Sequence, residues 1–181
     1  MSNVLIGIIG VILFIGLALA GALILGDDFK SSRASTTAAT IASQMQQISA
    51  AINMRNLKTG TTMSAVNYET NVAALVPRFL KSAPTIPMSG AVYRTVDVDG
   101  FGRDMPIHHL QARLGPAGDE VARSVCREIE AQSGAADPDA AIAAITTQDQ
   151  WTVRVNGARK VVGCFLYTAN GINAYNAFLL L

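Results

Sequence analysis

The sequence is poor in the residues that carry most enzyme chemistry. Of 181 residues, only two are histidines and two are cysteines. It contains no phosphate-binding P-loop, no dinucleotide-binding fingerprint and no G-x-S-x-G nucleophile motif. His108 and His109 are adjacent, so a Ser-His-Asp triad would have to use this pair. We therefore expect a protein that is not an enzyme and needs no cofactor.

Charge is also sparse and mixed in sign. Charged residues make up 15% of the chain, the formal net charge is +1, and no block of like charges occurs. A nucleic-acid-binding domain usually carries a basic patch. We therefore expect no direct contact with nucleic acid.

Metal-binding patterns are missing or incomplete. Neighbouring residues on an extended chain point in opposite directions, so His108 and His109 do not form a metal site together, and we expect a surface or turn role for them. The stretch DVDGFGRD (97–104) alternates acids and glycine like a calcium loop, but it lacks the full spacing and the closing glutamate. A hairpin turn without metal is the expectation there.

No charged residue occurs before Asp27. Val4–Leu25 supplies 22 residues interrupted only by glycines, and a transmembrane helix needs about 20. A cleaved signal peptide is the alternative, and Ala18–Leu19–Ala20 matches its cleavage pattern. The basic start of a signal peptide is missing, however, and the apolar core exceeds the usual length of about 7–15 residues. The segment favours a membrane helix.

Two indications of orientation conflict. The first positive charges, Lys30 and Arg33, follow the apolar segment, which would place that side in the cytoplasm. Cys126 and Cys164 form an even pair that predicts a disulfide in an oxidising compartment, with two unrelated buried thiols as the alternative. The indications agree if a basic leader, since removed, preceded Met1.

A helical pattern continues beyond the apolar segment. No proline or glycine occurs from Asp27 to Arg55, and apolar residues recur at spacings of 4, 3, 4, 3 and 4. We predict one helix from near residue 2 to near residue 55, roughly 80 Å long at about 1.5 Å per residue. The seam that its second half buries consists of Ala34, Ala38, Ile41, Met45, Ile48 and Ile52.

The rest of the chain predicts an α+β domain. We expect a short helix over 71–80, a loop over 81–90 and a strand over 91–100. Asp119 and Gly134 bound a clear helix, and 135–144 predicts a loop followed by a helical turn.

Residues 151–181 predict a three-stranded meander with turns at Asn156–Gly157 and Asn170–Gly171 and with Cys164 in its middle strand. The antiparallel sheet is expected to pack on the long helix, whose apolar half protrudes. The apolar residues that end the chain (Phe178–Leu181) need cover either from a neighbouring subunit or from both faces of the same domain.

This layout resembles the type IV pilins, and the type IVb branch more closely. The resemblance covers essentially the whole chain. It rests on the long N-terminal helix, the sheet domain, and a cysteine pair in VARSVCREIEAQSG and VVGCFLYTANG. The stretch NVAALVPRFLKSAPTIPMSG is similar to the segment that follows the long helix in these pilins. The implied division is 1–56 as helix, with 1–26 in the membrane or fibre core and 27–56 amphipathic, and 57–181 as head domain.

The resemblance implies a structural role. A prepilin peptidase removes a basic leader, Met1 becomes the mature, usually methylated N-terminus, and the subunit waits in the inner membrane. Pilus assembly machinery then builds identical subunits into an extracellular fibre of a Gram-negative bacterium. The apolar helices form the fibre core. Adhesion, motility, and DNA or phage interaction are roles of such fibres.

Small residues recur along the apolar segment and favour close helix packing, although they are also common in membrane helices. Gly16–Ala20 and Ala22–Gly26 are small-xxx-small pairs. The residues expected to pack in the fibre core are Gly7, Gly10, Gly16, Ala20, Ala22 and Gly26.

The chain departs from the pilin pattern at Leu5, where the family normally has a glutamate that pairs with a neighbour's N-terminal amine. The helix-breaking proline of the family is also absent. The departure leaves open a minor pilin or pseudopilin that primes or caps a fibre. A separate alternative is a single-pass, membrane-anchored periplasmic binding domain that never polymerises.

Overall fold

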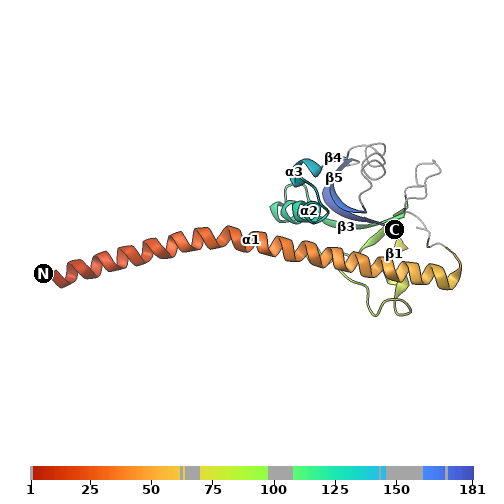
Figure 1. The fold of residues 1–181 in the computed structure, drawn as a ribbon, viewed down its shortest axis with the longest axis horizontal. Helices are drawn as coiled ribbons and strands as arrows, with labels where there is room; N and C mark the ends of the chain where they lie inside the picture. The colour runs from red at the N-terminus through yellow and green to blue at the C-terminus, as the bar shows by residue number, and fades with distance from the viewer. Residues whose placement is uncertain are drawn as a thin grey trace. The chain divides into compact units, whose positions relative to one another are not determined.

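The computed structural model describes residues 2–61, 63, 70–97, 108–142, 144–145, 161–169 and 171–181 (Figure 1). For residues 2–7 and 18–28, and for 70, 71, 96, 97, 108, 144, 145 and 169, it describes the backbone alone. The chain is an α+β protein with a long N-terminal helix and a largely antiparallel sheet, as predicted.

Helix α1 spans Ser2–Thr59, which agrees with the predicted helix within four residues at its C-terminal end. It ends where Gly60 adopts a positive φ of 66° and donates its N–H to the carbonyl of Asn56 at 2.9 Å. Glycine takes this left-handed conformation at little cost, which explains why the helix ends there.

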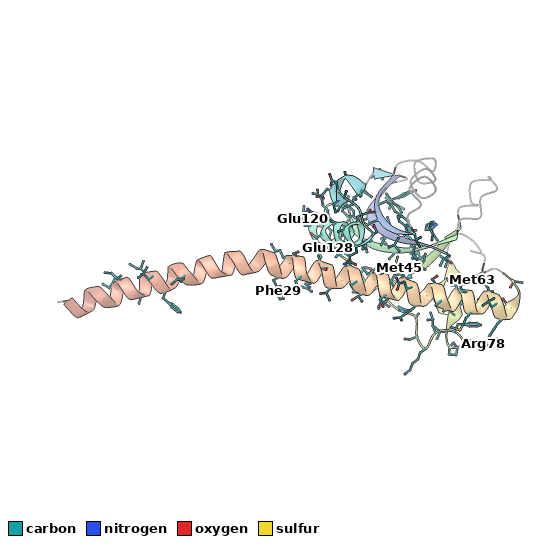
Figure 2. All side chains as sticks on the ribbon, in the orientation of Figure 1. Phe29, Met45, Met63, Arg78, Glu120 and Glu128 are labelled. Atoms are coloured by element: carbon teal, nitrogen blue, oxygen red, sulfur yellow. A yellow bond between two sulfur atoms is a disulfide. The ribbon has the colours of Figure 1, made fainter. Side chains whose placement is uncertain are left out.

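The predicted seam of α1 is buried. Ala34, Ala38, Ile41, Met45, Ile48 and Ile52 are all 5% exposed or less. Figure 1 shows this half of α1 running along the sheet, and Figure 2 labels Met45 on it. Next to β2, the buried Tyr93 donates its hydroxyl to Oε1 of Gln44 at 2.6 Å. Burial raises the pKa of the Tyr93 hydroxyl, so it stays a hydrogen-bond donor.

The chain divides into two compact units, Met1–Ala34 and Ser35–Leu181. The predicted boundary at residue 56 marks the end of the helix, whereas packing assigns the second half of α1 to the globular unit. The reason is the apolar seam, which supplies one wall of the core of that unit.

In the described part of the chain, six strands form one sheet in the order β1-β2-β3-β6-β5-β4. They are β1 (Thr70–Asn71), β2 (Arg94–Asp97), β3 (His108–Pro116), β4 (Ala144–Ile145), β5 (Val162–Ala169) and β6 (Ile172–Leu180). The pairs from β1 to β5 are antiparallel, and the two-residue β4 pairs parallel to β5. The parallel edge strand was not predicted.

The segment 71–80 differs from its prediction. Instead of a regular helix it forms the end of β1 and one 3-10 turn, η2 (Val72–Leu75), in which Val72 and Leu75 are buried. Pro77 accounts for the difference, because proline lacks an N–H and disfavours helical geometry in the residue before it.

The histidine prediction is wrong for His109. This residue lies in β3 between Val96 of β2 and Leu180 of β6, and it is only 3% exposed. No strand was predicted for the region around it. Strand β3 is central in the sheet, and its pairing partners come from distant parts of the sequence.

The helix between Asp119 and Gly134 and the helical turn after it form as predicted. Helix α2 spans Glu120–Gln132, and Oδ1 of Asp119 accepts the N–H groups of Val121 and Ala122 at 2.9 and 3.2 Å. Gly134 follows the helix with a positive φ of 88°. A short helix, α3 (Pro138–Ala141), forms the predicted turn.

Strands β5 and β6 form the predicted hairpin, with Cys164 opposite Ala177. Residues 174–179 of β6 are all buried, so the chain itself covers both faces of its last strand. Of the predicted features, the 97–104 loop after Asp97 and the Asn156–Gly157 turn with its preceding strand lie outside the described residues.

The packing of α1 gives a first prediction. Replacing the fully buried Ile48 with alanine should lower the free energy of unfolding by about 2–5 kcal/mol, because it leaves a cavity in the core. The exposed Gln46 provides the control, and Gln46→Ala should change stability by less than about 0.5 kcal/mol. Urea unfolding of the full chain in mild detergent, followed by near-ultraviolet circular dichroism, measures both. Equal effects would show that the seam does not form the core.

Candidate functional site

The first candidate site is the apolar surface of α1. Every described side chain from residue 8 to residue 17 is exposed, and the large apolar ones are 50–74% exposed. Phe14 and Leu17 are the most exposed of them, each at 74%. A helix that is apolar on every side is stable where lipid or other protein covers it. This segment therefore has the character of a contact surface.

Glycines on this segment leave room for a neighbour. A Cβ atom built on Gly10 or Gly16 would meet nothing within 4 Å. Gly7, Ala20, Ala22 and Gly26 lie on the same helix, but only their backbone is described, and the same holds for Leu5. Met1 lies outside the described residues. The predicted roles of these residues therefore stay predictions.

Counting only the residues whose side chains the structure describes, no helix is both long and apolar enough to cross a membrane. The predicted span Val4–Leu25 lies partly outside them, because residues 4–7 and 18–25 are described by their backbone alone.

The second candidate site joins α2 to β5. A disulfide links Cys126 of α2 to Cys164 of β5, and their Cα atoms are 5.4 Å apart. Both residues are fully buried. The bridge connects a helix to a strand that follows it by 38 positions in the sequence, so it closes a long loop.

A buried carboxylate lies one helical turn beyond the first cysteine. Glu130 is 0% exposed, and its Oε1 accepts the backbone N–H of Cys164 at 2.7 Å. Strand β5 makes room for it with a glycine. A Cβ on Gly163 would lie 2.9 Å from the same oxygen and 2.8 Å from the ring of Phe178. Helix and strand are thus joined twice, by a covalent bond and by a buried hydrogen bond.

Sequence reasoning missed Glu130. A signal existed, because Glu130 lies four residues after Cys126 and next to Ile129, on the stripe that the helix buries. Acidic residues are rarely fully buried, which argued against including it in the core.

Hollows beside α1 are further candidate sites. Two hollows, of about 510 and 690 Å³, flank α1. Asn53, Asn56, Leu57, Gly60 and Thr61 line the first, and of the described residues that line the second, Lys81 alone is charged. In the described part of the chain, no three His, Cys, Asp or Glu side chains could hold a metal ion together. The geometry supports contact surfaces and a stapled scaffold.

No protein-family model, characterised protein or solved structure matches the chain. Its function must therefore be inferred from the residues and their arrangement.

The disulfide gives a second prediction. Cys126→Ser/Cys164→Ser should lower the free energy of unfolding by about 3–4 kcal/mol, since the bridge restricts a loop of this length in the unfolded chain. Mass spectrometry after alkylation should find no reactive thiol in the native protein and two after reduction. Two alkylatable thiols in the native, unreduced protein would contradict the bridge.

Glu130 gives a third prediction. Glu130→Leu leaves the Cys164 N–H without this acceptor, and stability should fall by about 1–3 kcal/mol. Glu130→Gln keeps an oxygen in place and should cost less. Glu128→Gln, at a half-exposed position of the same helix, is the matched control and should have almost no effect. Urea unfolding of the disulfide-intact protein tests the order. Equal losses for Gln and Leu at position 130 would rule out the hydrogen bond as the cause.

Proposed function

We propose that this chain is a structural subunit of a type IV pilus-like filament and that it polymerises through the apolar half of α1. The observation that carries the proposal is the contrast within one helix. Residues 8–17 expose large apolar side chains, whereas the stretch from Ala34 to Ile52 buries a seam in a folded head. The resemblance of the layout to type IVb pilins adds support.

The hydrophobic effect keeps this segment out of water, both before and after assembly. Fully burying a large apolar side chain stabilises by roughly 1.5–3 kcal/mol, and eight such side chains between Ile8 and Leu17 are at least half exposed in the single chain. Lipid covers them before assembly and neighbouring helices cover them afterwards. Because both environments are apolar, the exchange depends on packing quality.

Small residues provide that packing. Open positions at Gly10 and Gly16 let a second helix approach closely, and Gly7, Ala20, Ala22 and Gly26 extend the pattern. In this account Met1 is the processed and methylated end, and a leader peptidase and an assembly machine act on the chain in the inner membrane. The product is an extracellular homopolymer, with adhesion or motility as a property of the whole fibre.

The disulfide and the hydrogen bond of Glu130 suit a head domain that is exported from the cytoplasm. A disulfide persists in an oxidising compartment, outside the cytoplasm, and here Glu130 reinforces the same connection. The head would keep its shape while exposed on a fibre.

A second candidate is a minor pilin or pseudopilin that primes or caps a fibre. Leu5 favours it, because no acidic residue occurs before Asp27 to pair with the N-terminal amine of a neighbour. The chain would then be a trace component of a filament built from other subunits.

A fourth prediction tests polymerisation by helix packing. Gly16→Ile fills an open position yet keeps the helix apolar, so the chain should still reach the membrane. Fibre yield should fall about tenfold or more, because lost close packing of at least about 1.4 kcal/mol per contact has that effect. The measurement is electron microscopy of sheared fibres from cells that express the chain with an assembly system.

Leu17→Ile is the matched control, and its fibre yield should equal that of the wild type. Normal fibres from Gly16→Ile would contradict close packing at this position. A wild-type chain that stays in the membrane as a monomer would instead support an anchored binding domain.

A further inference from the structure

The charges of this nearly neutral chain are separated along its sequence. From residue 29 to residue 96 there are seven basic residues and one acid, Glu69. From residue 117 to residue 142 there are six acids and two arginines. Both segments contribute to the globular unit Ser35–Leu181. The basic residues of the first segment are Lys30, Arg33, Arg55, Lys58, Arg78, Lys81 and Arg94.

The basic strip, defined as Lys58, Arg78 and Lys81, consists of one residue in the last turn of α1 and two in the segment after η2, and Lys81 also lines the hollow beside residues 36–47 of α1. The ammonium of Lys58 lies 5.7 Å from the ring centre of Phe79, which brings the two segments together. All three basic side chains are exposed, and within the described residues none forms an ion pair. Charges of one sign thus face solvent along this edge.

An exposed apolar residue, Leu57, precedes Lys58 in the last turn of α1. Leu57 is 85% exposed and lines the hollow of about 510 Å³ at the end of α1. Exposed leucine next to a hollow and a row of cations has the composition of an interface, which combines an apolar centre with a polar rim.

The acidic stripe, defined as Glu120, Val121, Ser124 and Glu128, runs along α2. Spacings of three and four residues place these side chains on one face of the helix. Val121 is 60% exposed. Arg123 and Arg127 lie beside this stripe on α2 and pair with Asp139, at 3.5 and 3.4 Å from its carboxylate. The stripe therefore presents two carboxylates around an exposed valine.

The two surfaces lie on different sides of the head. Figure 2 shows Glu120 and Glu128 on the α2 side of α1 and Arg78 on the other side. One head cannot bring its own strip and stripe together. A neighbouring copy can offer the stripe to the strip.

We propose that the basic strip of one copy binds the acidic stripe of a second copy, with Val121 packed against Leu57 at the hollow. Because the two surfaces lie on different sides of the head, the contact is head-to-tail, and repeating it produces an open array or a ring rather than a two-fold dimer. This inference rests on the proposed function and adds to it the contact between heads. Charge complementarity of this kind sets the partner and the register more than the affinity.

A second copy fits the surface better than a free polyanion. The chain itself carries a stripe of opposite charge, and that stripe has an apolar residue to match Leu57. A polyanion would satisfy the cations but leave Leu57 and Val121 exposed.

Two charge-reversed chains test the contact. The first carries Lys58→Glu, Arg78→Glu and Lys81→Glu, and the second carries Glu120→Lys and Glu128→Lys. Each full chain is expressed with the assembly system, and sheared fibres are counted by electron microscopy. Each chain alone should give about tenfold fewer fibres than the wild type, because like charges then face each other.

The two variants expressed together should restore fibres that contain both chains in alternation. The acidic strip of the first accepts the basic stripe of the second, and the unchanged surfaces match in the other direction. One chain carrying all five substitutions should also assemble. Arg113→Glu, at an exposed position of β3 outside both surfaces, is the control and should assemble normally. Circular dichroism and a thiol count verify that every variant folds.

The outcomes separate the two proposals. Absence of wild-type fibres would overturn the proposed function itself. Wild-type fibres together with full yields from both reversed chains would overturn only the head contact. Loss in both chains without rescue in combination would also overturn it. If strip reversal leaves assembly intact but lowers retention of fibres on immobilised heparin or DNA, the strip binds polyanions and the proposal is wrong.

Discussion

Burial of the apolar seam of α1 is the interaction on which the rest of the structure depends. The seam provides one wall of the core of the head, and Tyr93 attaches the segment before β2 to the same helix through Gln44. A helix that ended at residue 34 would leave the sheet without this cover. The same helix continues toward the N-terminus with a different surface, apolar on every described side from residue 8 to residue 17. One element thus serves two environments.

Two further links reinforce the head between α2 and β5. Helix α2 is joined to β5 by the Cys126–Cys164 bridge and by the hydrogen bond from Cys164 to Glu130. Gly163 is part of this arrangement, because any side chain there would collide with the carboxylate and with Phe178. The cystine, Glu130 and Gly163 therefore have to occur together where α2 packs on β5. A covalent bond fixes the distance between helix and strand, and the carboxylate satisfies a buried backbone donor.

Local periodicity explains which parts were predictable. The seam repeats every 3.6 residues along the helix. The residues that cap α2, and the turn between β5 and β6, lie next to the elements that they end or connect. Strand β3 and the burial of His109 escaped prediction because both depend on partners far away in sequence. Pro77 prevented the helix expected over 71–80. Glu130 escaped because its burial depends on a strand that the helix meets only after folding. The contact residues on α1 were predicted from composition. A single chain shows no contact with another chain, so their role stays a prediction.

Residues 8–17 decide the central claim, that this chain polymerises by burying the apolar half of α1. The most direct measurement is cryo-electron microscopy of sheared filaments from cells that export the wild-type chain, combined with mass spectrometry of their content. The account predicts this chain as the repeating unit, with Phe14 and Leu17 at the filament axis and the head outside. Filaments that contain the chain but expose this segment, or filaments built without it, would contradict the account.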